Sequence, residues 1–245
     1  MLNFMVANFV SNKNFDSKKR LLQILRAQID NSLDLKWNID DIVVMSNFEF
    51  EYRGIKTTVS KLNETCATGS KMFGLRAFLN MVDYKGTVWS HDLDTWESVK
   101  IDEPEFKDVG VAQYSNGKYN GGSLFWKVPE SSDIIAKICS DIESGNLERE
   151  EPTLNTVLKS KEYKKRVAVV NNTYNVGCSG YVVRYNKSEK PLKVCHFHSD
   201  NRIAWETHAL DRNNLGEVGI TVRLERIIRS HYPNLAYKVT SKKMR

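Results

Sequence analysis

Glycine, proline and cysteine are all scarce in this chain of 245 residues. With 13 glycines and 5 prolines, it lacks the composition of a collagen-like or low-complexity protein. The four cysteines, Cys66, Cys139, Cys178 and Cys195, form no Cys-x-x-Cys pair. A structural zinc site or a secreted disulfide framework is therefore not expected, and reduced cytosolic thiols are. Because 41% of the residues are hydrophobic, the chain can bury the core of one domain.

Segments that would direct the chain to a membrane are also missing. No apolar run reaches the roughly 18 residues that a membrane span requires. Residues Met1–Val10 have neither the basic start nor the long apolar core of a signal peptide.

The sequence contains no GxxxxGK(S/T) phosphate loop, no GxGxxG turn after the first predicted strand and no GxSxG elbow. We therefore predict a cytoplasmic protein without a membrane span and without any of these three sites.

Apolar strands alternate with amphipathic helices through the first two thirds of the chain. The spacing of apolar residues predicts a helix around Leu21–Ile29 and another at Lys71–Met81. This order predicts an α/β fold with a largely parallel sheet flanked by helices and with ligands at the carboxyl ends of the strands. The predicted strands are Leu2–Val10, Asp41–Phe48, Lys56–Leu62, Thr87–Ser90, Val109–Tyr114, Ser123–Val128, Val167–Val170, Tyr181–Tyr185 and Leu192–His198. The later predicted helices are Ser131–Ser144, Thr153–Lys165 and Gly216–His231.

An Asp-x-Asp motif, Asp92 to Asp94, follows the predicted strand Thr87–Ser90. Side chains two residues apart in an extended segment point to the same side, so the two carboxylates are expected to meet at one point. Carboxylate oxygens suit a hard divalent cation such as Mg²⁺ or Mn²⁺, which shares its remaining positions with phosphate oxygens. A solvated surface turn would fit the same residues, and the motif alone leaves both interpretations open.

Five segments carry a family resemblance: Ser70–Arg76, Thr87–Asp94, Tyr119–Ser123, Glu150–Asn155 and Val194–His198. Taken in this order, they resemble the GT-A glycosyltransferases, and within them the glycogenin and bacterial lipopolysaccharide galactosyltransferase group. The resemblance covers most of residues 1–205 and implies a GT-A-like nucleotide-sugar transferase domain at residues 1–210. For the fold it implies, more specifically, a GT-A-like (Rossmann-like) mixed, mostly parallel sheet. The implied enzyme is a glycosyltransferase that moves a hexosyl or pentosyl group from a nucleoside diphosphate sugar, with a UDP-sugar favoured, and uses Mn²⁺ or Mg²⁺.

The resemblance also implies roles for single residues in binding. Asp92 and Asp94 would hold the metal ion. His196 would be the third ligand, with His198 as its rival, and an imidazole ligand suits Mn²⁺ better than Mg²⁺. Arg202 replaces a lysine that the family has near the diphosphate. The residues implied in donor binding are Lys71, Arg76, Asp92 and Arg202.

Three residues are implied as catalytic: Glu150, Glu151 and Asn120. Glu151 stands where the family has a glutamine, and a carboxylate there could act as nucleophile, base or stabiliser of an oxocarbenium-like transition state. The alternative is that Glu148, Glu150 and Glu151 form only a solvated helix start. Asn120 and the two glycines after it could let the backbone approach the donor sugar, or could form a tight hairpin turn.

The net charge of +6 is concentrated at the C-terminal end. Residues 221–245 contain seven lysines and arginines against one glutamate, which accounts for the whole net charge. We predict that residues 211–245 form a basic helix and tail packed on the same domain. Arg223, Arg226 and Arg229 could track the phosphates of DNA, or the segment could be a solvated end. The helix shows no apolar-aromatic face, which favours nucleic acid over a membrane.

The size and the Asn/Lys-rich composition also resemble bacteriophage transferases that glycosylate hydroxymethylated bases of DNA. That resemblance favours such a base in phage DNA as the acceptor and the host cytoplasm as the location. A glycan, lipid or protein acceptor is the alternative within the same enzyme class. The alternative outside it is a non-catalytic nucleic-acid-binding or nucleotide-binding module.

Overall fold

Seven strands form the central sheet of the computed structural model, which describes residues 1–10, 15–62, 70–114, 116–145, 150–177, 185–196 and 221–232. These strands are β1 (Leu2–Ala7), β2 (Ile42–Ser46), β5 (Thr58–Val59), β6 (Gly86–His91), β8 (Val109–Gln113), β9 (Tyr119–Val128) and β10 (Val167–Val169). Their order across the sheet is β10-β8-β9-β6-β1-β2-β5. Only β9 runs antiparallel to its neighbours within this sheet, and the other pairings are parallel. The predicted mixed, mostly parallel sheet is confirmed.

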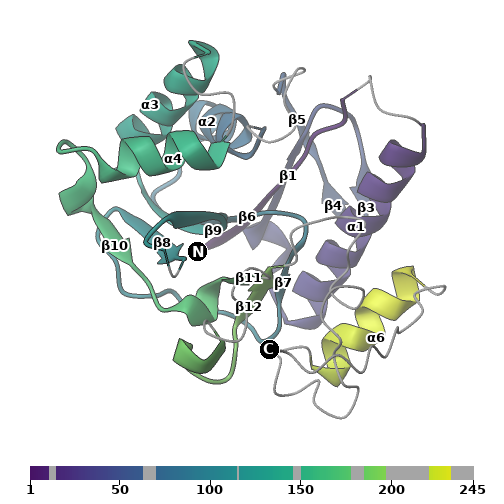
Figure 1. Cartoon of the computed structure of the whole chain (residues 1–245). Coiled ribbons are helices and arrows are strands. Elements are labelled where there is room, and N and C mark those ends of the chain that lie inside the picture. The colour runs from purple at the N-terminus through teal and green to yellow at the C-terminus, as the bar shows by residue number, and fades with distance from the viewer. Residues whose placement is uncertain are drawn as a thin grey trace.

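Helices cover both faces of this sheet (Figure 1). Three of them, α2, α3 and α4, lie on one face, while α1 lies on the other with α6 beside it. The helices are α1 (Phe15–Asp34), α2 (Ser70–Met81), α3 (Ser132–Glu143), α4 (Glu150–Lys159) and α6 (Val222–His231), with short 3₁₀ turns at η1 (Ile39–Asp41), η3 (Lys164–Arg166) and η4 (Asn172–Tyr174). A small second sheet contains β7 (Thr95–Glu97), β11 (Val176–Gly177) and β12 (Val194–His196), and β3 (Glu51–Tyr52) pairs with β4 (Ile55–Lys56).

The central strands bury side chains on both faces, which explains their nearly continuous apolar runs. Phe4 and Val88 point into the core beneath α2, α3 and α4. The next residues along the same strands, Met5 and Trp89, point into the core beneath α1. All four side chains are fully buried, and burying each stabilises the fold by about 1.5–3 kcal/mol. The alternation of side chains along each strand therefore produces two cores from one sheet.

The direction of β9 brings its beginning to the ligand-binding edge of the sheet. Because β9 runs antiparallel to β6, its first residues lie beside the last residues of β6, and His91 pairs with Ser123. The motif Tyr119–Ser123 therefore lies next to the end of β6 and the residues that follow it.

Several predicted element boundaries differ from the structure. The predicted strand Lys56–Leu62 is two short strands, β4 and β5. The predicted helix Thr153–Lys165 begins at Glu150 and ends at Lys159. It can begin before Pro152 because this proline falls in the first turn, where a backbone N–H has no intrahelical partner. Of the predicted strand Tyr181–Tyr185, Tyr185 is helical and residues 181–184 lie outside the described residues.

The C-terminal helix α6 carries an aliphatic face that packs within the chain, and the helix itself has no apolar-aromatic face. Leu224 and Ile228 are fully buried and pack with Ile24 and Ala27 of α1. The face is a narrow aliphatic stripe at helical spacing that has no aromatic residue, and it serves packing within the chain. The part of the predicted helix before residue 221 lies outside the described residues. Among the described helices, none is both long enough and apolar enough to cross a membrane.

Glu97, the last residue of β7, is a buried carboxyl beneath this helix. Trp37 Nε1 donates to it at 2.7 Å and the Ile101 amide at 2.6 Å. Burial raises the pKa of Glu97 to about 7, against the opposing effects of these donors and of Arg223 and Lys100. The folded state thus binds this proton more tightly than the unfolded state does.

This difference predicts a pH-dependent stability. A carboxyl with a raised pKa contributes its stability fully below its unfolded pKa and loses that contribution as the pH rises through its folded pKa. We expect the free energy of unfolding of Glu97→Gln, relative to wild type, to rise by up to about 3 kcal/mol between about pH 5 and pH 8. Urea unfolding of both proteins across this range measures it. A constant difference between the two proteins would contradict the raised pKa.

Candidate metal and donor site

Asp92 and Asp94 lie on a tight turn between β6 and β7. The prediction placed both on an extended segment, but β6 ends at His91 and the chain reverses directly after it. The Asp92 amide donates to the Gly122 carbonyl at 3.0 Å, and the Thr95 amide donates to the Asp92 carbonyl at 3.0 Å. The second bond closes a four-residue turn. The two carboxylates therefore face one region because of the turn and not because of strand alternation.

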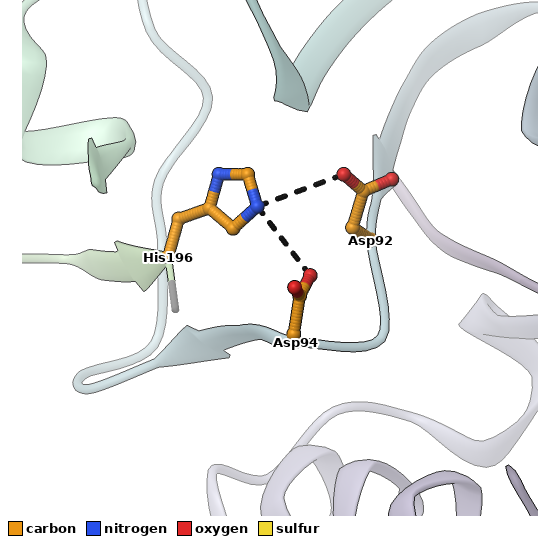
Figure 2. A group of neighbouring side chains, drawn as sticks. All are labelled: Asp92, Asp94 and His196. Carbon is orange, nitrogen blue, oxygen red and sulfur yellow. Dashed lines mark ion pairs between the residues drawn. The ribbon is translucent and has the colours of Figure 1, made fainter. Parts of the chain in front are cut away.

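His196 reaches the same region from the end of β12. This strand pairs antiparallel with β7, so that His196 lies opposite Thr95, next to the turn. Its Nε2 lies 3.4 Å from Asp94 Oδ1 and 3.7 Å from Asp92 Oδ2 (Figure 2). One ligand atom from each of the three side chains lies within 4.8 Å of the others. This cluster could hold a metal ion, and the rival ligand His198 lies outside the described residues.

The charges in this cluster stabilise one another. Burial acts to lower the pKa of His196, but Asp94 and Asp92 outweigh it and raise the value. Burial acts to raise the pKa of Asp92, but Lys71 and His196 lower it. The side chains of Asp92 and Asp94 remain 41% and 23% exposed, whereas that of His196 is 4% exposed. The carboxylates of Asp92 and Asp94 are thus accessible to a ligand.

Lys71, in the first turn of α2, is a buried cation beside the turn. Its side chain is 5% exposed, and its Nζ lies 2.6 Å from Asp92 Oδ1 and 3.1 Å from Glu150 Oε1. It also donates to the Gly121 carbonyl. Although burial opposes its charge, Asp92 and Glu150 raise the pKa of Lys71. Removing one partner of such a buried pair typically costs about 3–5 kcal/mol, because the other charge is left uncompensated.

Glu150 and Glu151 begin α4 with different surroundings. Glu150 is buried against Lys71, and burial raises its pKa to about 7 although Lys71 opposes the shift. Glu151 is less buried and accepts long hydrogen bonds from Gly121 N and the Tyr114 hydroxyl, both at 3.4 Å. The solvated helix start therefore does not describe Glu150. The third glutamate of that alternative, at position 148, lies outside the described residues.

Asn120 lies within strand β9 and not in a hairpin turn. Its side chain is buried, and its Oδ1 accepts from the Gly122 amide at 2.8 Å. Its Nδ2 has no hydrogen-bond partner in the described part of the chain. A buried amide donor without a partner costs free energy, which a ligand atom could recover.

Gly122 leaves the space that the imidazole of His196 occupies. A Cβ atom at Gly122 would lie 2.0 Å from His196 Cε1 and 2.1 Å from Nδ1, far inside van der Waals contact. At the neighbouring Gly121, the nearest atom to such a Cβ would be Glu150 Oε1 at 3.7 Å, an ordinary contact. The close approach of His196 is a reason for glycine at position 122 that the sequence does not predict.

Arg76, another predicted donor-binding residue, does not join the cluster. Arg76 Nη1 donates to Glu143 of α3 at 3.1 Å, and the guanidinium stacks over Phe73. Five residues on a helix separate side chains by about 140°, so Arg76 and Lys71 point to different sides of α2. Arg202 lies outside the described residues.

The three predicted DNA-binding arginines of α6 differ in how they are held. Arg223 donates to Asp34 at 3.0 Å and to the carbonyls of Glu97 and Ser98 at 3.1 Å each. Arg229 donates to Glu225 at 2.9 Å. The side chain of Arg226 is 72% exposed and reaches Asp34 only at 3.4 Å. Arg223 thus fastens α6 to the end of β7, and Arg226 is the most exposed of the three.

One polar residue near the turn, Gln28 of α1, was not predicted. It donates to the carbonyls of Leu93 and Thr95, on either side of Asp94. A signal was present in the sequence, because Gln28 interrupts the apolar stripe that contains Leu25 and Ile29.

Comparison with solved structures finds glycosyltransferases of the same fold. The galactosyltransferase LgtC, solved with donor and acceptor sugar analogs, aligns with a TM-score of 0.57 and 12% identity over 94% of this chain and 96% of that chain. The glycosyltransferase GlyE of Streptococcus pneumoniae aligns with a TM-score of 0.56 and 12% identity over 99% of this chain and 66% of that chain. Mouse xyloside xylosyltransferase 1 aligns with a TM-score of 0.51 and 12% identity over 81% of this chain and 98% of that chain.

The sequence by itself matches no protein-family model and no curated protein. The chain nevertheless has the GT-A glycosyltransferase fold, as predicted from the resemblance.

The space beside Gly122 predicts a sharp difference between two glycine variants. Gly122→Ala should displace the imidazole of His196 and weaken Mn²⁺ binding by about tenfold or more, whereas Gly121→Ala should bind Mn²⁺ nearly as wild type does. Electron paramagnetic resonance of free Mn²⁺ during titration measures both, and circular dichroism checks that both variants fold. Equal affinities of the two folded variants would show that His196 does not need the space.

Proposed function

We propose that this chain is a metal-dependent glycosyltransferase that moves a sugar from a nucleoside diphosphate sugar to an acceptor. The observation that carries this proposal is the meeting of Asp92, Asp94 and His196 at the carboxyl end of β6 in a GT-A fold. In an α/β sheet this edge is where ligands bind. Asn120 supports the proposal, since its buried amide donor has no partner in the described part of the chain.

The three side chains fit a divalent cation. Two carboxylates and one imidazole offer oxygen and nitrogen ligands, a set that suits Mn²⁺ better than Mg²⁺. Asp92, Asp94 and His196 would hold the ion. Charge stabilisation of the departing diphosphate is the chemistry that a bound divalent ion supplies. The donor that we propose is a UDP-sugar, which is the donor class that the family resemblance implies.

We assign the remaining roles at the site to three side chains of the protein. Lys71 holds Asp92 in place and offsets part of the negative charge of the cluster. Glu150 is committed to Lys71, so we assign it the positioning of that cation. Within the described part of the chain, the Glu151 carboxylate accepts only long hydrogen bonds, from Gly121 N and the Tyr114 hydroxyl, and we propose that it acts on the sugar as nucleophile, base or stabiliser.

Two acceptor classes are supported by different observations. A hydroxymethylated base in phage DNA is supported by the basic C-terminal sequence, of which Arg226 is the most exposed arginine in α6. A carbohydrate acceptor is supported by LgtC, whose structure contains an acceptor sugar analog. Because Arg223 is engaged within the fold, Arg226 is the residue that tests the DNA acceptor without disturbing α6.

The metal site predicts different effects for its two carboxylates. Asp94→Asn should lower transfer by about a hundredfold or more with a smaller loss of stability than Asp92→Asn, since it weakens only the contact with His196 and leaves the pair between Asp92 and Lys71 intact. Asp92→Asn should lower transfer and also stability, because it removes a charge that compensates the buried Lys71. Asp40→Asn, an exposed carboxylate on η1, is the control and should leave both unchanged.

The assay incubates the protein with Mn²⁺ and a panel of nucleotide sugars, with modified DNA or saccharides as acceptors, and identifies products by mass spectrometry. Thermal unfolding is measured on the same samples. Transfer that continues in EDTA, or in Asp94→Asn, would refute the metal-dependent mechanism.

A DNA acceptor predicts a salt-dependent effect of Arg226. If Arg226 contacts a phosphate, Arg226→Gln should weaken DNA binding and reduce the slope of log K against log salt concentration by about one. Lys56→Gln on β4, an exposed cation far from α6 in the sequence, is the matched control. Fluorescence anisotropy of labelled DNA at several salt concentrations measures the slope. An unchanged slope in Arg226→Gln would rule out a phosphate contact there and favour the carbohydrate acceptor.

A further inference from the structure

We infer that Gln28 is a positioning residue for the metal carboxylates, because its side-chain amide holds the turn that carries Asp92 and Asp94. The inference rests on the proposed metal site. Gln28 lies on α1, far from the turn in the sequence, and it is not one of the predicted site residues.

The contacts of Gln28 lie on both sides of Asp94. Its Nε2 donates to the Leu93 carbonyl at 2.7 Å and to the Thr95 carbonyl at 2.9 Å. Gln28 is only 1% exposed. A side-chain amide nitrogen has two hydrogens, and these two carbonyls use both of them. A single buried group thus fixes the backbone immediately before and after a proposed metal ligand.

The turn needs such a support because it lies outside the strand ladders. Leu93 and Asp94 stand between the end of β6 and the start of β7. On one side, the Gly122 carbonyl receives the Asp92 amide and the Thr95 hydroxyl, each at 3.0 Å. From α1, Gln28 supplies two further hydrogen bonds to the turn. The turn is therefore held between β9 and α1.

The buried position of Gln28 in α1 would destabilise the fold if its side chain did not bind the turn. It interrupts an apolar stripe, where an unpaired amide would be destabilising. Asn31, one turn later, donates in a similar way to the Glu97 carbonyl at 3.0 Å, three residues beyond Asp94. Asn31 is also 1% exposed and so offers a matched comparison: a buried amide of the same helix, bonded to the same chain segment, but not to the turn.

Groups that orient metal ligands from behind usually change metal affinity by about 10- to 100-fold when they are removed. The Gln28→Met variant keeps the length of the side chain and removes both donors. We expect it to raise the dissociation constant for Mn²⁺ by about tenfold or more. Asn31→Leu, which removes the matched donor, should change it by no more than about twofold. Gln28→Glu should lie between wild type and Gln28→Met, because a buried, protonated carboxyl has one donor hydrogen instead of two.

The experiment titrates Mn²⁺ into wild type, the three variants and Asp94→Asn, follows free Mn²⁺ by electron paramagnetic resonance, and records thermal unfolding of each protein. The order wild type, Gln28→Glu, Gln28→Met in falling affinity, with Asn31→Leu near wild type, supports the inference. If Gln28→Met does not fold, the test is the comparison of Gln28→Glu with Asn31→Leu, and the inference requires Gln28→Glu to bind Mn²⁺ more weakly than Asn31→Leu does.

Two results would overturn the inference, and they are distinguishable. If wild type binds Mn²⁺ and Asp94→Asn abolishes binding, but the Gln28 variants bind as Asn31→Leu does, the metal site stands and Gln28 has no positioning role. If wild type binds no Mn²⁺, the proposed metal site fails, and the role of Gln28 fails with it.

Discussion

The hydrogen bond from the Asp92 amide to the Gly122 carbonyl is the contact on which the arrangement of the site depends. It continues the antiparallel pairing of β6 and β9 by one step beyond the strand end and starts the reversal into β7. The same carbonyl receives the Thr95 hydroxyl, and Gly122 itself leaves room for His196. One backbone position on β9 therefore locates two elements that carry the three candidate metal ligands.

Charge balance is the second constraint on this site. Asp92, Asp94 and Glu150 bring up to three negative charges close together, and Lys71 is the buried cation among them. Without it, burial and mutual repulsion would favour protonated carboxyls, which are poor metal ligands. Lys71 therefore keeps Asp92 ionised. As a consequence, a change at Asp92 affects both the stability of the fold and the binding of a ligand. Asp94 has no ion pair with Lys71 in the described structure.

The C-terminal helix is part of the frame of the site and not only a basic extension. Arg223 binds the carbonyls at the end of β7, and the aliphatic face of α6 packs on α1. Helix α1 in turn supports the metal turn through Gln28. The net charge of a segment cannot distinguish arginines that bind within the fold from exposed ones, because both kinds contribute the same charge and differ only in their partners.

Local patterns in the sequence were enough to predict the alternation of strands and helices, a largely parallel sheet and the placement of an Asp-x-Asp motif at a strand end. These features follow from side-chain periodicity, which acts over a few residues. The tertiary structure decided that Lys71 and not Arg76 faces the carboxylates, that Gly122 must admit His196, and that the carboxylates meet on a turn. Each of these depends on segments that are far apart in the chain, and periodicity identifies the apolar face of an element but not which polar side chain meets another element.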